Sequence, residues 1–234
     1  MKIKLVDIHT HLIPDVDDGS FSIEESIAMV ETMINDGITD VIATPHVQSM
    51  ATTKSVAEQR TGFLYLKDAI AKSGLDINLY LGFEVRYVPH LRPDYEELTL
   101  NNSKYILMEF SNSTDHDLVD VFFNLRGLGL TPVIAHIERY SYMTLEYAEQ
   151  LKKLGAIIQV NANSIIKPRS KHIKKLVNAM LKNEVIDIIA SDMHNLRQRP
   201  NNLKKAYMHL KNKVSKEYLD ELFYSNGKKI IENK

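Results

Sequence analysis

The sequence predicts a distorted (β/α) barrel of seven strands, formed as a single domain by residues 1–234. Short runs rich in β-branched residues alternate with longer helix-like segments, and these runs are apolar throughout, as in strands buried on both faces. Residues that could bind divalent metals recur where the runs end. A barrel brings the ends of all its strands to one face. An open doubly wound sheet would show the same alternation, but it would gather such residues mainly at one switch point.

The composition is that of one large domain without cysteine. The chain has 234 residues, of which 44% are hydrophobic and 25% charged, enough for a sizeable core. The lack of cysteine excludes disulfides, thiolate metal sites, iron–sulfur clusters and a cysteine nucleophile. A formal net charge of −1 argues against a general nucleic-acid-binding protein, which needs a strongly basic surface. Chemistry must therefore come from oxygen and nitrogen groups.

The N-terminal segment begins basic and then apolar, but it does not form a targeting sequence. Asp7, His9 and His11 interrupt the apolar run, so we expect no signal peptide or membrane insertion there or later. The expected location is cytoplasmic. A homo-oligomer is compatible with the sequence.

Seven apolar runs of strand length predict the sheet. Each is apolar rather than alternating, as expected for a strand buried on both faces of a parallel sheet. The runs cover residues 4–8, 38–44, 77–83, 105–110, 131–136, 156–161 and 185–191.

Helical patterns fill the intervals between the runs. The first helix should begin after Ser22, which forms a capping box with Glu25, and should end before Gly37. Pro89 and Pro93 leave room only for a short helix near 95–98. Amphipathic patterns predict further helices at about 53–73, 116–128, 144–154, 170–182 and 201–213.

Two histidines at the end of the first run could share a metal ion. On an extended segment, His9 and His11 project to the same side. A histidine pair of this spacing is weak evidence for a metal site by itself. The preceding strand, which is of the buried type, favours the metal-binding interpretation. The acidic turn that follows does not match a calcium-binding loop, because Gly19 falls where a ligand is needed. We expect one aspartate of this turn, Asp18, to face the histidine pair.

Two glutamates end other apolar runs. An ionised carboxylate near a barrel interior is costly unless a cation compensates it, so Glu84 and Glu109 indicate nearby positive charge. An ion pair with Arg86 is the alternative explanation for Glu84. Asp192 and His194 repeat the spacing of the first pair after the last run.

The complete candidate set contains five imidazoles and four carboxylates. This mixture without thiolates suits zinc, manganese or iron, and it is too large for one ion, so two or three ions are expected. The other histidines, at 90, 116, 172 and 209, are interpreted as structural. The candidate ligands are His9, His11, Asp18, His46, Glu84, Glu109, His136, Asp192 and His194.

Two arginines could bind an anion beside these metals. Arg139 lies three residues after His136, and Arg199 lies seven after Asp192. Four carboxylates facing three divalent cations leave positive charge, which attracts a group such as phosphate. Guanidinium groups can hold phosphoryl oxygens in bidentate fashion. We therefore assign both arginines to substrate binding and catalysis.

At this point the chain resembles the PHP (polymerase-and-histidinol-phosphatase) metal-dependent phosphoesterases, and within them the CpsB/CapC capsule-locus tyrosine-protein phosphatases. The ordered set of motifs is specific, although each motif is weak alone. The chain departs from the family's pattern at Ile137 and in the loop at 166–169, so the rim of the site should differ more than its metal chemistry. The motifs are DIHTHLIPDVDDG, TPH, GFEVR, MEF, HIERY, QVNANS and SDMHNLRQRP.

The resemblance implies a site of three ions, usually Mn²⁺, with Fe, Zn or Mg as alternatives. Glu84 would bridge two of them, and Arg139 and Arg199 would contact phosphate. The implied substrate is the phosphotyrosine tail of a tyrosine autokinase that controls exopolysaccharide assembly. By the same resemblance, the first ion would take His9, His11, Glu84 and Asp192; the second Glu84, Glu109 and His136; and the third Asp18, His46 and His194.

Three alternatives stay open from the sequence. A histidinol-phosphate or other small-molecule phosphomonoesterase would use the same scaffold. An amidohydrolase-type barrel also begins with a histidine pair, but it typically uses a modified lysine where this chain has Glu84 and Glu109. A metal-loaded module that only binds a phosphotyrosine tail is the third. The basic segment 167–175 either steers an acidic tail toward the site or is a solvated helix face.

Overall fold

The strands follow the apolar runs of the sequence. The computed structural model describes residues 3–232. All seven predicted runs contain a strand, and the first is buried at every position, as predicted for strands covered on both faces. The strands are β1 Leu5–Thr10, β2 Ile38–Ala43, β3 His46–Val47, β4 Asn78–Leu81, β5 Glu84–Arg86, β6 Tyr105–Glu109, β7 Thr131–Ile134, β8 Ile157–Asn161 and β9 Ile188–Ala190.

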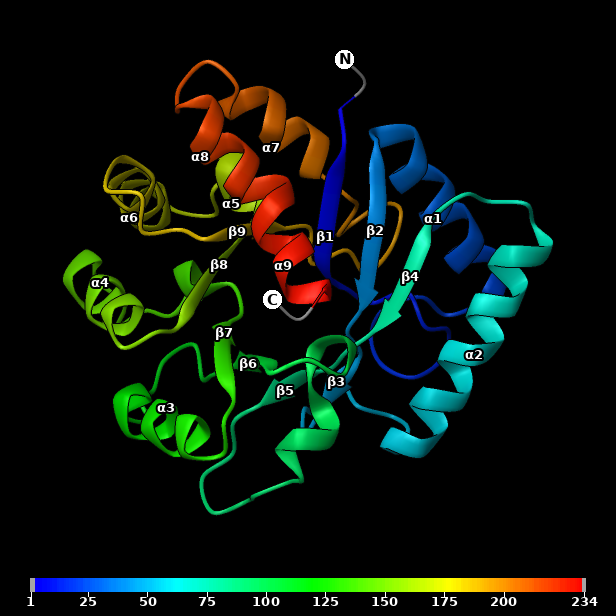
Figure 1. The fold of residues 1–234 in the computed structure, drawn as a ribbon, viewed down its shortest axis with the longest axis horizontal. Helices are drawn as coiled ribbons and strands as arrows, with labels where there is room; N and C mark the ends of the chain where they lie inside the picture. The colour runs from blue at the N-terminus through cyan, green and yellow to red at the C-terminus, as the bar shows by residue number, and fades with distance from the viewer. Residues whose placement is uncertain (1–2, 233–234) are drawn as a thin grey trace.

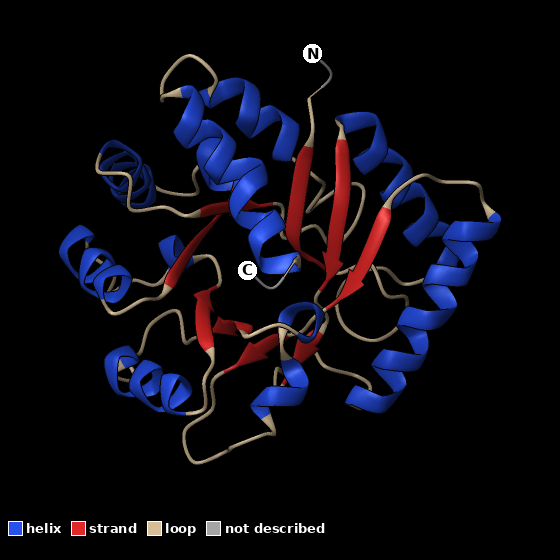
Figure 2. Cartoon of the chain, viewed as in Figure 1, coloured by secondary structure: helices blue, strands red, loops and turns tan. Residues whose placement is uncertain are grey.

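The described strands form two parallel sheets that follow one another around the molecule (Figures 1 and 2). The first has the order β1-β2-β4 and the second β3-β5-β6-β7-β8-β9. The second and third strand paths each break in the middle, which divides them between the two sheets. Between the last strand and the first, the only described pairing is a parallel bridge from Thr10 to Met193. The parallel α/β fold is thus confirmed, whereas the hydrogen-bonded sheets do not close into one seven-stranded ring.

Most helices lie outside the strands, whereas the C-terminal helix α9 lies across the space that the strands surround (Figures 1 and 2). All predicted helices are present, but the sequence prediction missed α5 and the C-terminal group after α7. The residues near 95–98 form a short 3-10 helix, η1, as expected. The helices are α1 Ile23–Asp36, α2 Val56–Lys72, α3 Leu118–Gly127, α4 Leu145–Lys153, α5 Ala162–Ile166, α6 Lys171–Lys182, α7 Leu203–Leu210, α8 Lys216–Asp220 and α9 Asn226–Ile231, with short turns at η2 Leu100–Asn102, η3 Ile137–Arg139 and the π-helical η4 Glu221–Ser225.

Local capping explains where α1 begins and ends. Ser22 accepts a hydrogen bond from the N–H of Glu25, and Gly37 adopts a left-handed φ of 92° that most other residues would resist. The predicted capping box is incomplete, because the Glu25 carboxylate accepts from the N–H of Phe21 rather than from that of Ser22.

The buried apolar side chains form two clusters. The larger one fills the space between the strands and the surrounding helices. The smaller one joins side chains of β1, β6, β7 and β9 to Ile230 and Ile231 of α9. Each of these two isoleucines contributes on the order of 1.5–3 kcal/mol by burial. The C-terminal helix thereby covers the apolar cluster between the strands, and the polar candidate residues gather where the strands end.

Candidate metal centre

The first strand delivers two histidines whose outer ring nitrogens face each other. The Nε2 atoms of His9 and His11 lie 3.4 Å apart. Gln159 Oε1 lies 3.2 Å from Nδ1 of His9, and Asp17 Oδ2 lies 2.8 Å from Nδ1 of His11. An acceptor at Nδ1 fixes the N–H there and leaves Nε2 with a free lone pair, the usual arrangement around metal-binding histidine.

Glu84 lies at the centre of the cluster. The parallel register sets His46 of β3 beside Glu84 of β5. The Glu84 side chain is fully buried. Its Oε2 lies 3.2 Å from Nε2 of His9 and 3.3 Å from Nε2 of His11. The same oxygen is 3.0 Å from Nδ1 of His46, and Oε1 is 2.9 Å from Nε2 of His136.

A second group of ligand-type atoms surrounds Asp18 on the exposed side. Its Oδ1 lies 3.4 Å from Nε2 of His46 and 3.3 Å from Nε2 of His194. The His194 ring also lies against His11, with centroids 3.7 Å apart. Asp18 is about half exposed, whereas both histidines are buried, so this group opens toward solvent.

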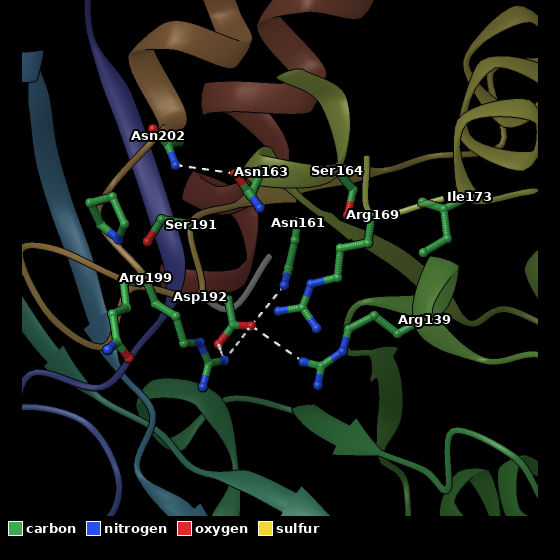
Figure 3. Close-up of a pocket in the computed structure, with 12 residues that line it drawn as sticks. Arg139, Asn161, Asn163, Ser164, Arg169, Ile173, Ser191, Asp192, Arg199 and Asn202 are labelled. Carbon is green, nitrogen blue, oxygen red and sulfur yellow. Dashed lines mark hydrogen bonds and ion pairs between the residues drawn. The ribbon is translucent and has the colours of Figure 1, made fainter. Parts of the chain in front are cut away.

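Asp192 connects the histidine pair to the two arginines. Its Oδ1 lies 3.6 Å from Nε2 of both His9 and His11. Nη2 of Arg199 contacts both carboxylate oxygens at 2.9 and 2.8 Å, and Nη1 of Arg139 lies 3.6 Å from Oδ2. The two arginines approach Asp192 from different sides (Figure 3).

Glu109 sits at the edge of the cluster and pairs with Arg86, the arginine that the sequence analysis considered as a partner of Glu84. Its Oε1 lies 3.9 Å from Nε2 of His136. The alternative explanation of Glu84 as a partner of Arg86 is wrong, because Nη1 of Arg86 binds Oε2 of Glu109 at 3.1 Å. The register explains this, since Arg86 of β5 lies opposite Glu109 of β6.

The pKa shifts of the buried groups reflect a cluster rich in carboxylates. Burial lowers the pKa of His9, but Glu84 and Asp192 outweigh it and raise the pKa to about 9. Burial raises the pKa of Asp192, but His9 and Arg199 outweigh it and hold that pKa well below its usual range. For His194, burial and the neighbouring His11 lower the pKa to about 4. Buried carboxylates in this number need cations around them.

The donor atoms fit divalent metal ions. The ligands of one ion, each about 2.1 Å from it, lie roughly 3.0–3.4 Å from one another. Oε2 of Glu84 meets three ring nitrogens at such distances yet makes a hydrogen bond with none of them. Atoms that converge without hydrogen-bonding geometry are those expected around a cation. Three groups have ligand atoms within 4.8 Å of one another: His11, Asp18, His46 and His194; His9, His11 and Glu84; and His46, Glu84 and Glu109.

The structure therefore brings all nine candidate ligands into one region, and their role as ligands stays a prediction. Its grouping differs from the family-based one, since His11 also lies with the Asp18 group and His46 also lies with the two glutamates. The four histidines interpreted as structural lie outside these groups. Of them, His116 stacks near Tyr87, with ring centroids 5.6 Å apart.

Sequence reasoning missed the residues that orient the ligands. Gln159 accepts from His9 and from the N–H of His136, and its amide nitrogen donates to Asn161 at 2.9 Å. Asn161 in turn donates to Oδ2 of Asp192 at 2.7 Å. Asp17 orients His11 and accepts from the N–H of His46 at 3.0 Å. The available signals for Gln159 were its place as a polar residue inside the apolar run 156–161 and its membership in the motif QVNANS.

A pocket adjoins the cluster at Asp192 (Figure 3). Its cavity volume is about 60 Å³, and it opens to solvent. Its wall comes from the ends of β8 and β9 and from the segments around α5, α6 and α7. The residues that line it are Arg139, Asn161, Asn163, Ser164, Arg169, Ile173, Ser191, Asp192, Gln198, Arg199, Pro200 and Asn202.

Fold and site together have the form of a metal-dependent hydrolase: a parallel α/β scaffold with a buried histidine–carboxylate cluster beside arginines. Residues 5–232 match the family model for capsular polysaccharide synthesis, CpsB/CapC, and the chain belongs to this family.

Curated relatives and a solved structure cover nearly the whole chain. The tyrosine-protein phosphatase CpsB of Streptococcus pneumoniae is 32% identical, over 97% of this chain and 98% of the relative. CpsB of Streptococcus agalactiae is 31% identical over 98% and 99%. A crystal structure from work on YwqE of Bacillus subtilis and CpsB of S. pneumoniae, described as unique metal-dependent tyrosine phosphatases, superposes with a TM-score of 0.90 at 28% identity, covering 98% of this chain and 95% of that one.

More distant structures share the fold alone. The phosphotriesterase of Mycobacterium tuberculosis has a TM-score of 0.62 at 11% identity, covering 99% of this chain and 95% of that one. No helix among residues 3–232 is long and apolar enough to cross a membrane.

Proposed function

We propose that this protein is a metal-dependent protein-tyrosine phosphatase. The observation that carries the proposal is that nine candidate metal ligands, Glu84 and Asp192 among them, lie in one region, with two arginines at Asp192 facing an adjoining pocket. The names of the relatives in the CpsB/CapC family support the same activity. We propose three ions, normally Mn²⁺, held by the ligand sets that the family resemblance implies.

Different residues of the chain have different roles in the proposed hydrolysis. Divalent ions, when bound, lower the pKa of water toward neutrality and withdraw charge from phosphoryl oxygens. Glu84 and the buried histidines would hold those ions. Arg139 and Arg199, anchored on Asp192, turn their remaining N–H groups toward the phosphoryl oxygens. Tyrosine has a pKa near 10, so the phenolate can leave without a dedicated general acid.

We further propose the biological setting that the family resemblance implies. The substrate would be the phosphotyrosine tail of a tyrosine autokinase that regulates capsular or exopolysaccharide synthesis, and the reaction would take place in the cytoplasm. The match of residues 5–232 to a capsular polysaccharide synthesis family supports this setting. We also propose that the chain is one domain and that its seven strand paths constitute a distorted barrel, because one large hydrophobic cluster spans β1 to α8.

Rates on matched substrates test the proposed activity. The Mn²⁺-loaded protein should hydrolyse a phosphotyrosyl peptide with a kcat/KM well above that for histidinol phosphate. A preference for histidinol phosphate would replace the proposal with a small-molecule phosphomonoesterase. Binding of the peptide without turnover of any phosphomonoester would indicate a tail-binding module instead.

A further inference from the structure

The pocket beside Asp192 extends away from the metal cluster. Of the nine candidate ligands, Asp192 alone lines it. The opposite wall consists of Asn163 in α5, Ile173 in α6 and Asn202 before α7. A phosphate bound by Arg139 and Arg199 beside Asp192 would therefore lie at one end of this pocket, and the cavity of about 60 Å³ leaves space for a small neighbouring group of the same substrate.

Arg169 supplies a third guanidinium group to this pocket. It belongs to the segment between α5 and α6, and its side chain points into the pocket alongside Asn161 and toward Arg139 (Figure 3). Arg139 and Arg199 each bind Asp192. Arg169, by contrast, is an exposed residue of the pocket wall that makes no ion pair or hydrogen bond with any of residues 3–232, so its N–H donors are open to solvent and to a ligand in the pocket.

The remaining wall favours an anion. Three guanidinium groups face a single carboxylate, that of Asp192, and the other polar residues of the wall are neutral amides and hydroxyls. Amide and guanidinium N–H groups are donors to carboxylate and phosphate oxygens. Outside this wall, Nη1 of Arg199 also lies 3.4 Å from Oδ2 of Asp18. Among residues 3–232, Arg169 is therefore the guanidinium of this pocket that has no carboxylate partner, and an anionic group of a ligand would compensate its charge.

We propose that Arg169 and the amide-lined end of the pocket form a subsite for a second anionic group of the substrate, next to the phosphotyrosine in the peptide. The ligand is a carboxylate or a second phosphate. Arg169 is thus a specificity-determining residue of the proposed phosphatase, and this inference rests on the proposed function. The subsite would select phosphotyrosine in acidic surroundings over isolated phosphotyrosine or small aryl phosphates.

The same segment contains matched controls. Lys167 and Lys171 carry the same charge within two residues of Arg169, but neither lines the pocket. If positive charge near the site merely steers acidic substrates, Lys171→Ser and Arg169→Ser should have similar effects. If Arg169 contacts the bound substrate, only Arg169→Ser should lower kcat/KM for acidic substrates.

The experiment compares kcat/KM for wild type, Arg169→Ser, Arg169→Lys and Lys171→Ser, all loaded with Mn²⁺. The substrates are p-nitrophenyl phosphate and phosphotyrosyl peptides that differ in one residue near the phosphotyrosine, which is Glu, phosphoserine or Gln. Wild type should prefer the Glu or phosphoserine peptide, and whichever is favoured identifies the anion. Arg169→Ser should lower the ratio of kcat/KM for that peptide to kcat/KM for the aryl phosphate by about tenfold, chiefly through KM. The ratio for Arg169→Lys should lie between those of wild type and Arg169→Ser, and the ratio for Lys171→Ser should equal that of wild type.

Binding gives a second readout. The affinity for a non-hydrolysable phosphonate analogue of the favoured peptide should weaken about tenfold in Arg169→Ser, while the analogue of the Gln peptide should bind both proteins equally. An unchanged substrate ratio in Arg169→Ser, or an equal change in Lys171→Ser, would overturn the subsite. A uniform loss on all substrates would assign Arg169 to the reacting phosphate and also overturn it. Failure of wild type to hydrolyse any phosphotyrosyl substrate would instead overturn the proposed function.

Discussion

Single side chains decide how the metal-binding groups are presented. Gln159 joins three elements by hydrogen bonds, to His9 in β1, to the backbone of His136 after β7, and to Asn161, which holds Asp192. The chain of donors and acceptors fixes the orientation of both amides. Partners that orient ligands in this way commonly contribute 10–100-fold to metal affinity.

Gln159→Leu should therefore weaken Mn²⁺ binding by about 10–100-fold while the fold persists. The substitution keeps the size of the side chain but removes the acceptor for His9. Metal affinity is measured by competition with a chelating dye, and circular dichroism checks the fold. Gln150→Leu, at an exposed position of α4, is the control. Wild-type affinity in Gln159→Leu would show that the network does not orient the ligands.

The arginines at Asp192 should act through geometry as well as charge. Arg139→Lys and Arg199→Lys retain the positive charge but lose the planar fork, so each should lower kcat/KM on a phosphotyrosyl peptide about tenfold or more. Metal content, measured by elemental analysis, should stay at the wild-type level. Wild-type kcat/KM in both variants would make them ordinary surface residues.

At the scale of elements, the loop between β1 and α1 brings two aspartates to the histidines. Asp17 and Asp18 can do so because Gly19 passes directly beside His11. A Cβ on Gly19 would lie 2.4 Å from both Cβ and the carbonyl oxygen of His11. Such a distance forces the loop away from the strand.

Gly19→Ala should accordingly destabilise the protein by about 1–3 kcal/mol and weaken metal binding at the Asp18 group. Urea unfolding measures the first effect and dye competition the second. Gly127→Ala, where a Cβ would meet nothing within 4 Å, should leave stability unchanged or slightly raised. Equal stability of the two variants would contradict this account of the loop.

The sequence predicted the elements well where apolar periodicity was strong. It located every strand run and, except for α5, the helices up to α7, because buried strands and amphipathic helices leave clear patterns. The breaks that create β3 and β5 were not predictable, since they depend on how neighbouring strands pair. The helix α5 directly follows β8 without a turn signal. The C-terminal π-helical segment η4 has no periodicity that distinguishes it from an α-helix.

The sequence predicted which residues belong to the site, but not which of them contact one another. Charged residues at the ends of apolar runs identified the candidate ligands, since burial of such groups needs a reason. Which oxygen faces which nitrogen depends on register and rotamer, so the pairing of Arg86 with Glu109 was missed. Asp17 was passed over because its neighbour Asp18 fits the same pattern equally well in sequence.

At the scale of the whole molecule, the candidate ligands join strand paths that come from almost the full length of the chain. Ions that bind the folded state alone should raise its stability, and Glu84 should matter most because it contacts the most ligand-type nitrogens. Mn²⁺ should raise the Tm of chelator-treated wild type. The rise should be smaller in Asp18→Ala and smallest in Glu84→Ala, as scanning calorimetry can show. An equal rise in Glu84→Ala and wild type would contradict a central role for Glu84.

The central claim is that this cluster hydrolyses phosphotyrosine through bound metal. The most direct test measures metal content and phosphotyrosyl-peptide hydrolysis on the same sample before chelation, after chelation and after Mn²⁺ is returned. Nine candidate ligands and no cysteine leave metal-activated water as the evident nucleophile. We expect hydrolysis to disappear with the metal and to return with Mn²⁺. Full activity in a sample shown to be free of metal would contradict the account.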